Sequence, residues 1–292
     1  MIGSRLVQFL VDAGNEVSVL DDFSRGRVSV EGATYHNDAD ATSLKSCRKY
    51  FNGVDTVYNL AAYVAGVTYN QTHHHEMFLN NLKLQCVPLQ AAAEMGVVNF
   101  LQVSSVCVYA EDKQNPCKES DIGGEPHAAN AGYAWAKRMG ERAVAWANIP
   151  HAVIVRPANC YGINDYFDDR AHVIPALIKK ILHNETIEVN GTGQEVREFL
   201  FADDAARGMI VALERGNGIY NIGSDGENSC TIAELVYTLR EMLGVDKSIT
   251  FTGGEGGDSR RIVNGDKLMR LGWEAQMSLQ DGLKAVCEWY QK

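Results

Sequence analysis

A tyrosine and a lysine stand four positions apart in the segment YAWAK, at Tyr133 and Lys137. On a helix this spacing places both side chains on one face. A phenol has an ordinary pKa of about 10, so Tyr133 can carry a proton at neutral pH only if a nearby cation stabilises its phenolate. Lys137 could supply that charge. The pair taken alone also fits an ordinary helical contact, because this spacing is common by chance.

A hydroxyl group is expected close to this pair. The segment NFLQVSS predicts a strand that ends at Ser104 and Ser105, about one helical crossover before Tyr133. Ligands of a doubly wound sheet bind beyond the carboxyl ends of its strands. Ser105 could therefore hydrogen-bond the substrate oxygen that Tyr133 protonates, whereas Ser104 is expected to be a structural residue.

Alternating helical and extended patterns in the first half predict the elements that position these residues. Apolar residues at helical spacing predict a helix over 2–12, and Gly14 stands where its C-cap is expected. This alternation predicts an α/β fold with a doubly wound, Rossmann-like parallel sheet. The other expected elements are strands at 16–20, 56–62, 99–105 and 151–157 and helices near 78–95 and 131–147.

After about residue 163 the alternation loosens and glycine-rich segments appear, which indicates a smaller C-terminal substrate lobe. We expect a nucleotide-binding domain over 1–162 and roughly 198–223, and the lobe over 163–197 and 224–292. The opening MIGSRLVQFL looks like the end of a glycine-rich turn, with Gly3 as the one expected glycine present and the first strand absent. This pattern fits a truncated chain or a variant with a damaged dinucleotide site.

Composition narrows the class of protein. A net charge of -10 over 292 residues argues against a nucleic-acid surface. The cysteines, 7 in all, form no CxxC pair, which indicates reduced thiols and no zinc site. The run His73, His74 and His75 is expected to be a solvated loop, so no metal is expected. With neither a leader pattern nor a long apolar run, we expect a cytoplasmic protein without a membrane partner.

Short segments spread nearly from end to end resemble, in order and spacing, the extended short-chain dehydrogenase/reductase family of NAD-dependent nucleotide-sugar epimerases, dehydratases and reductases. The segments are IGSRLV, VLDDFSRG, NLAA, VSSVCVYA, YAWAK, RPANCYG, REFLFADD, NIGS and LGW. The resemblance implies a triad of Ser105, Tyr133 and Lys137 and hydride exchange with C4 of a nicotinamide. The cofactor contacts that it implies are Gly3, Asp21, Asp22, Ala61, Ala62, Tyr133 and Lys137.

The acid at the end of the second strand of such a domain selects the cofactor. A carboxylate accepts hydrogen bonds from a free ribose diol and repels a 2′-phosphate, so Asp21 favours NAD over NADP. Arg25 and Arg27 follow closely and could offset this preference. They fit two solvated loop charges equally well.

The segment after Ser105 separates activities within the family. The 4,6-dehydratases carry an Asp-Glu pair where this chain has Val106 and Cys107, so dehydration by that route is disfavoured. SVCVYA resembles GDP-fucose synthases and GDP-mannose 3,5-epimerases, in which the Cys moves a proton beside a ketone. His172 matches the partner acid of the former, and a neighbouring imidazolium would favour a Cys107 thiolate. Each residue alone also fits a structural role.

Residues for the nucleotide diphosphate follow from the same resemblance. Asn159 in RPANCYG matches a residue at the sugar-diphosphate entrance, and Arg197 and Arg260 match diphosphate clamps. An arginine fork suits phosphate oxygens. Arg261 fits a surface charge as well as a ligand, and Trp273 is expected to be packing.

Together these observations predict an NAD-dependent nucleotide-sugar epimerase that oxidises C4 transiently and inverts C3, C5 or both. A GDP-fucose-synthase-like epimerase and reductase that consumes NADPH is the first alternative. A truncated, non-catalytic sugar-nucleotide binder is the second. The resemblance also implies a homodimer paired through the helices near 78–95 and 131–147, although the same apolar stripes would also pack on the sheet.

Overall fold

The computed structural model describes residues 1–26, 28–168, 170–254 and 259–292. The elements up to residue 161 are α1 (Ile2–Asp12), β1 (Ser18–Leu20), β2 (Thr34–His36), α2 (Leu44–Phe51), β3 (Thr56–Asn59), α3 (Val67–Thr72), α4 (His74–Met95), β4 (Asn99–Val103), the 3-10 helices η1 (Val106–Val108) and η2 (Ala128–Asn130), α5 (Ala131–Trp146), β5 (His151–Pro157) and β6 (Asn159–Tyr161). Those that follow are α6 (Val173–His183), β7 (Ile187–Val189), β8 (Val196–Phe201), α7 (Ala202–Arg215), β9 (Gly218–Ile222), β10 (Ser229–Thr231), α8 (Ile232–Met242), β11 (Ile249–Phe251), β12 (Arg260–Arg261), α9 (Asp266–Met269) and α10 (Leu279–Tyr290).

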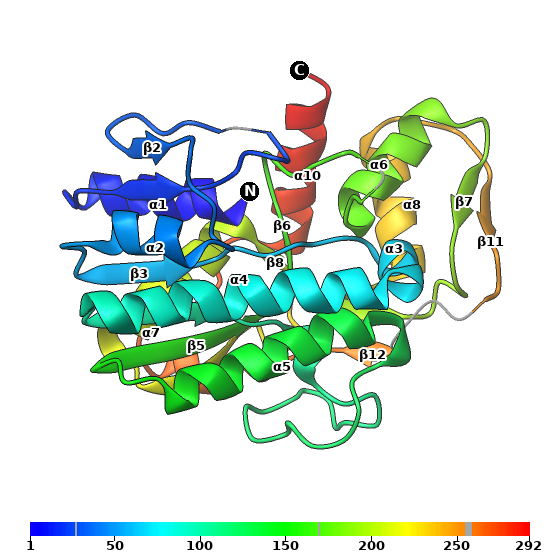
Figure 1. Cartoon of the computed structure of the whole chain (residues 1–292). Helices are drawn as coiled ribbons and strands as arrows, with labels where there is room; N and C mark the ends of the chain where they lie inside the picture. Colours follow the sequence, from blue (N-terminus) through cyan, green and yellow to red (C-terminus); the bar gives the residue numbers. More distant parts are fainter. Residues whose placement is uncertain (27, 169, 255–258) are drawn as a thin grey trace.

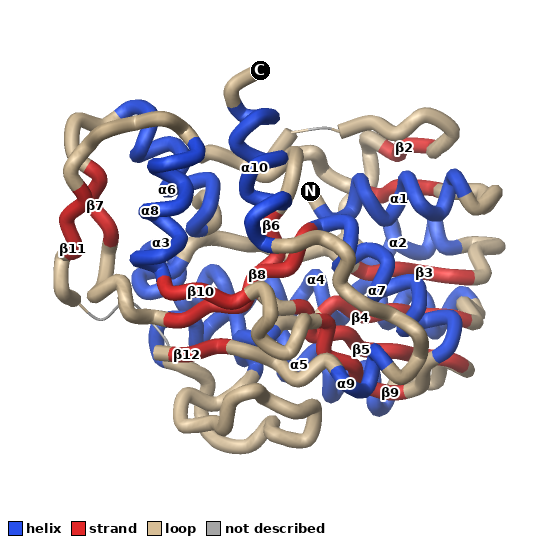
Figure 2. The backbone as a smooth tube through the Cα atoms, turned by 180° about the vertical axis from the view of Figure 1, so that it is seen from behind, coloured by secondary structure: helices blue, strands red, loops and turns tan. Residues whose placement is uncertain are grey.

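The central sheet is parallel, in the order β3-β4-β5-β9, and β1 and β2 form a separate parallel pair. Helices cover both faces of the sheet, with α4 and α5 side by side on one face and α7 on the other (Figures 1 and 2). The predicted α/β, Rossmann-like class is therefore confirmed. Because both faces are covered, the inner strands are apolar on both sides.

Alternate residues of the central strands feed two different cores. Phe100 and Ile154 pack with α2, α4 and α5, whereas their neighbours Leu101, Val153 and Val155 pack with α7. The reason is that successive side chains of a strand point to opposite faces of the sheet. The carboxyl ends of β4 and β5 are held between these layers. The residues that directly follow these two strands are therefore held in fixed positions.

The smaller lobe has its own sheet and core. β8 lies between β10 and β12 and also pairs with β6, while β7 pairs with β11. The buried faces of α6, α8 and α10 enclose this core, and β7 and β11 form the outer edge (Figure 1). The predicted division at 162, 197 and 223 stays a prediction. In the structure β9 lies beside β5 in the central sheet, and β8 lies in the lobe sheet.

Glycines determine where α4 ends and how closely α5 packs on it. α4 ends at Gly96, whose φ of +76° closes the helix without strain. α5 packs closely on α4 because a Cβ at Gly132 would overlap the backbone of His74, and one at Gly140 would meet Gln85 at 2.8 Å. One expectation is wrong: His74 and His75 open α4 and are not in a loop, although both are exposed.

In the described part of the chain, every helix is too short or too polar to cross a membrane. All the cysteines are free thiols. The paired helices α4 and α5 expose Leu79 and Met139 to solvent.

Candidate active site

Tyr133 and Lys137 lie on the face of α5 that is turned toward the end of β4. The Lys137 Nζ atom is 5.7 Å from the centre of the Tyr133 ring. Lys137 is almost fully buried, and Tyr133 is half-buried. The Nζ atom donates a hydrogen bond of 2.7 Å to the carbonyl of Val103, the last residue of β4. The helix and the strand end are thus joined at the pair.

Burial controls the protonation of both groups. It lowers the pKa of Lys137 to about 7, against the opposing charges of Glu141 and Cys107. It also raises the pKa of the Tyr133 phenol, a change that the hydrogen bond from Ser105 opposes. The structure therefore differs from the expectation of a lowered phenol pKa, because loss of hydration outweighs the neighbouring donors.

Ser105 begins the turn that follows β4. Its Oγ atom accepts a hydrogen bond of 3.1 Å from the backbone N–H of Cys107, which starts the short helix η1. The same hydroxyl hydrogen-bonds Tyr133. A serine hydroxyl, a phenol and a thiol thus meet beyond the end of β4, the position at which sheets of this class bind ligands.

Arg261 completes this cluster from the other lobe. Its Nη1 atom donates a hydrogen bond of 3.3 Å to the Cys107 Sγ atom, and the side chain is buried. In the parallel pairing of β12 with β8, Arg261 is opposite Arg197. Arg260, the residue predicted as a ligand, is exposed. The sequence left Arg261 open between a surface charge and a ligand, and the signal that separates it from Arg260 is that adjacent strand residues point to opposite faces.

His172 lies immediately before α6. Its Nδ1 atom is 3.3 Å from a carboxylate oxygen of Asp165, which is buried. Among the described contacts none joins His172 to Cys107, so their pairing remains a prediction. Asp165 was not identified from the sequence, although a carboxylate that orients a catalytic imidazole is a common arrangement.

Asp21 and Asp22 follow β1 and turn the chain. Asp21 accepts a hydrogen bond of 2.7 Å from the Phe23 N–H, and Asp22 one of 3.0 Å from the Ser24 N–H. Burial raises the pKa of the Asp21 carboxyl, against the lowering effect of the Phe23 hydrogen bond. Asp21 nevertheless retains an exposed edge. It can therefore still accept hydrogen bonds from a ribose diol.

Arg25 is engaged with the smaller lobe. Its guanidinium contacts Asp168 at 2.7 Å and the Val64 carbonyl at 3.2 Å, and lies 4.4 Å over the Tyr166 ring. Its Nε atom is buried without a hydrogen-bond partner in the described part of the molecule. Arg27 lies outside the described residues.

Ala61 and Ala62 lie in the segment after β3, which buried amides hold in place. Asn59 accepts a hydrogen bond from the Ala61 N–H at 3.2 Å and donates to Gln102 at 3.1 Å. Gly3 lies in the first turn of α1, where a Cβ would meet nothing within 4 Å. The open backbone at Gly3 and the Asp21 carboxylate fit one end of a dinucleotide. The Tyr133 and Lys137 pair fits the other end.

The predicted diphosphate residues lie in the sheet of the smaller lobe. Asn159 of β6 donates a hydrogen bond of 2.8 Å to the Glu198 carbonyl. Arg197 donates one of 2.9 Å to the Val196 carbonyl. Glu198 is fully buried, and its carboxylate accepts hydrogen bonds from the backbone of Ser224 and Val263, the latter at 2.9 Å. This carboxylate fixes the segment that carries Arg260 and Arg261.

Comparison with known proteins gives consistent matches. Residues 1–223 match the model of the NAD dependent epimerase/dehydratase family. The chain is 31% identical over 270 residues to GDP-L-fucose synthase 1 of Arabidopsis thaliana, covering 88% of this chain and 84% of that protein. It is 29% identical over 260 residues to GDP-L-fucose synthase of Escherichia coli, covering 81% and 80%.

Solved structures show the same fold. UDP-glucose 4-epimerase of Thermotoga maritima, solved with UDP-glucose, has a TM-score of 0.89 at 26% identity, over 100% of this chain and 96% of that one. A dTDP-glucose 4,6-dehydratase double mutant of Streptomyces venezuelae, solved with NAD, has a TM-score of 0.87 at 26% identity, over 100% and 94%.

Proposed function

The chain belongs to the NAD-dependent epimerase/dehydratase family, and from that premise we propose that it is a nucleotide-sugar epimerase that oxidises C4 transiently and inverts C3, C5 or both. The observation that carries this proposal is the meeting of Ser105, Tyr133 and Cys107 beyond β4. A phenol and a serine hydroxyl serve alcohol oxidation. A thiol beside them serves proton removal from a carbon next to the resulting ketone.

Oxidation at C4 needs a proton acceptor at the sugar hydroxyl. Tyr133 Oη takes this proton while Ser105 Oγ hydrogen-bonds the same oxygen. A nicotinamide, when bound, would supply the redox chemistry at C4 as hydride acceptor and donor. Lys137 lies on the same helix face, where its ammonium would favour the Tyr133 phenolate, against the raised pKa that burial gives the phenol, and could hold a ribose hydroxyl.

Inversion uses the acidity that a C4 ketone gives to C3 and C5. Cys107 Sγ, as a thiolate beside the Arg261 guanidinium, removes the proton from the adjacent carbon. His172, oriented by Asp165, returns a proton from the other face. Asn159, Arg197 and Arg260 are proposed to hold the nucleotide diphosphate, because the charged forks of arginine match phosphate oxygens.

A second candidate is an epimerase and reductase that ends by consuming NADPH. The curated relatives named GDP-L-fucose synthase favour it, as does the presence of both Cys107 and His172. Asp21 favours NAD, because its carboxylate would repel a 2′-phosphate. The two candidates therefore differ in whether the reduced cofactor is used up.

One experiment tests both candidates. Purified protein is incubated in deuterium oxide with GDP-, UDP-, dTDP- and CDP-sugars and with NAD or NADPH, and products are followed by NMR. An epimer with deuterium at C3 or C5 and no net cofactor use supports the first candidate, while stoichiometric NADPH oxidation supports the second. The Cys107→Ala variant is expected to lose deuterium incorporation. Incorporation that survives this change removes the thiol from the mechanism, and binding without turnover contradicts both candidates.

A further inference from the structure

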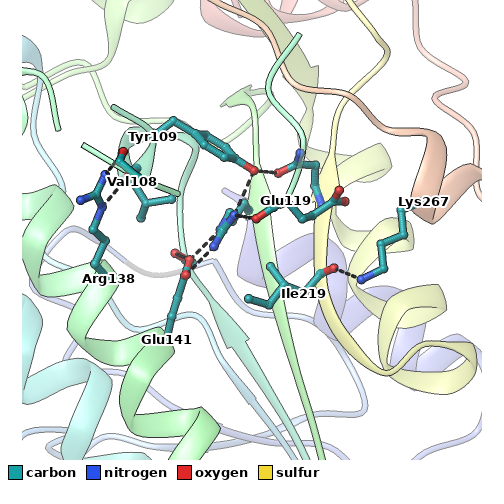
Figure 3. Close-up of polar contacts among 11 residues, drawn as sticks. Val108, Tyr109, Glu119, Arg138, Glu141, Ile219 and Lys267 are labelled. Atoms are coloured by element: carbon teal, nitrogen blue, oxygen red, sulfur yellow. Dashed lines mark hydrogen bonds and ion pairs between the residues drawn. The ribbon is translucent and has the colours of Figure 1, made fainter. Parts of the chain in front are cut away.

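A buried ion pair lies one helical turn beyond Lys137, on the same face of α5. Arg156 of β5 donates two hydrogen bonds to the Glu141 carboxylate, from Nε at 2.8 Å and from Nη2 at 2.6 Å. Both side chains are buried. Figure 3 shows Glu141 and Arg138 on the same helix, α5, with Tyr109 on the segment above them. The role proposed above for Tyr133 and Lys137 does not use this pair.

The remaining donors of the pair are satisfied. Arg156 Nη1 contacts the Tyr109 hydroxyl at 3.0 Å and the Glu119 carbonyl at 2.9 Å, and Tyr109 donates to Asn221 at 2.5 Å. Burial lowers the pKa of the Arg156 guanidinium, but the hydrogen bond and charge of Glu141 together with the contact to Tyr109 outweigh burial and raise the pKa. Arg156 is therefore a fixed positive charge that compensates the carboxylate of Glu141.

The carboxylate also contacts the strand end that carries the redox residues. Ser104 Oγ donates a hydrogen bond of 2.5 Å to Glu141, and the Ser104 N–H donates one of 2.8 Å to the Val155 carbonyl. Ser105 follows directly in the chain, and Val103, directly before, accepts from Lys137 Nζ at 2.7 Å. One carboxylate is thus tied to β4, β5 and α5 at the point where they meet.

The charges that face Lys137 come from few groups. Glu141 lies on its own helix, and Cys107 lies on η1. Tyr133 is one turn before it on α5, and Val103 of β4 contributes only a carbonyl. Arg156 and Arg138 face Glu141 from β5 and α5. Burial lowers the pKa of Lys137 to about 7, and two charges oppose this change, first that of Glu141 and then that of Cys107.

We propose that Glu141 is a positioning residue of the redox centre, which keeps Lys137 in the ammonium form and fixes the strand end that presents Ser105. This inference rests on the proposed roles of Tyr133 and Lys137, but the charge of Lys137 can be measured without a substrate. Arg156 holds the Glu141 carboxylate in place. If Glu141 had no effect on Lys137, this pair would be only a structural link between α5 and β5.

The test is the titration of Lys137, followed by NMR of lysine labelled with ¹³C at Cε. Its signal is assigned through the Lys137→Met variant. In Glu141→Gln the midpoint is expected to fall by about one pH unit or more, since an opposite charge at close range has been removed. Glu141→Asp retains the charge and is expected to titrate nearer to the wild-type protein. Equal midpoints in the wild-type protein and Glu141→Gln would overturn the inference.

A further variant separates an effect on the stability of the protein from an effect on the charge of Lys137. If Glu141→Gln does not fold, Glu141→Gln/Arg156→Met removes both buried charges and leaves no unpaired guanidinium. The Lys137 midpoint is compared with that of Arg156→Met alone, which keeps the Glu141 charge. It is expected to be lower in the double variant, and equal midpoints in the two folded variants also overturn the inference. With an active substrate, the pH profile of turnover is expected to shift with the Lys137 midpoint. A shifted midpoint without any turnover would leave the inference standing and count against the proposed function.

Discussion

The Arg261 guanidinium donates a hydrogen bond to Cys107 Sγ at 3.3 Å, between residues 154 positions apart. Arg261 belongs to the smaller lobe, and Cys107 follows the central strand β4. A cation beside a thiol favours the reactive thiolate. The contact therefore makes the proposed base dependent on how the smaller lobe is seated.

This contact predicts the reactivity of Cys107. Arg261→Gln is expected to slow its alkylation by iodoacetamide at pH 7, because the guanidinium that donates a hydrogen bond to Cys107 Sγ is gone. Labelling of the Cys107 peptide is measured by mass spectrometry. Arg260→Gln, a change on the exposed neighbour in the same strand, is the matched control. Equal rates in the two variants would show that Arg261 does not act on the thiol.

Tyr133→Phe is expected to lower turnover of the sugar by about 10²- to 10⁴-fold, because the Tyr133 phenolate is the proposed proton acceptor at C4. Affinity for the nucleotide sugar should change little. Both are measured, by steady-state kinetics and calorimetry. Tyr237→Phe, at an exposed position of α8, serves as the control. Turnover that persists in Tyr133→Phe would assign the proton transfer to another group.

Lys137 makes a pH-dependent contribution to stability. Its pKa falls from 10.5 to about 7 on folding, so between these values the unfolded chain holds a proton that the folded protein lacks. The free energy of unfolding should therefore rise with pH, by about 2 kcal/mol from pH 7 to pH 9. Lys137→Met is expected to lack this rise. Urea titrations of both proteins at each pH give the comparison, and parallel behaviour of the two would refute the lowered pKa.

Asp21 is predicted to select the cofactor. In Asp21→Ser the affinity for NAD should fall by about tenfold, since hydrogen bonds from the ribose diol to a charged acceptor are lost. The affinity for NADP should rise, because the repulsion of the 2′-phosphate is removed. Calorimetric titration with each cofactor measures both changes. An NADP preference in the unchanged protein would reverse the assignment and favour the reductase candidate.

Glu198 is predicted to be a stability residue of the lobe junction. Glu198→Ala leaves the buried N–H groups of Ser224 and Val263 unpaired and should lower the free energy of unfolding by about 3 kcal/mol. Glu185→Ala, at an exposed position, should change it by less than about 0.5 kcal/mol. Chemical denaturation measures both. A small effect at Glu198 would mean that water replaces the carboxylate.

Elements that depend on a local hydrophobic pattern could be predicted from the sequence. The helix at Ile2–Asp12 and the strand at His151–Pro157 were predicted with the bounds observed, because each shows one clear period. The strand from Thr56 was predicted to reach Ala62 but ends at Asn59. The cause is the Asn59 side chain, which accepts the Ala61 N–H and turns the backbone out of the sheet.

Contacts between distant segments could not be predicted in this way. The choice between Arg260 and Arg261 depends on the pairing of β12 with β8, which no local pattern encodes. The partnership of Glu141 with Arg156 depends on the seating of α5 against β5. An arginine inside the otherwise apolar run VIVRP was a signal that a buried acid lies nearby, since a buried charge needs a partner. The identity of that acid required the fold.

The Glu198 carboxylate joins β8 to the turns at Ser224 and Val263, so three stretches of chain share one anchor. Ser224 follows β9 of the central sheet, and Glu198 lies in the sheet of the smaller lobe, so unfolding of either lobe would break this anchor and we expect the two to unfold together. A ligand bound by one lobe would consequently protect amide protons from exchange in both, and a sugar nucleotide would raise the melting temperature of the cofactor domain as well.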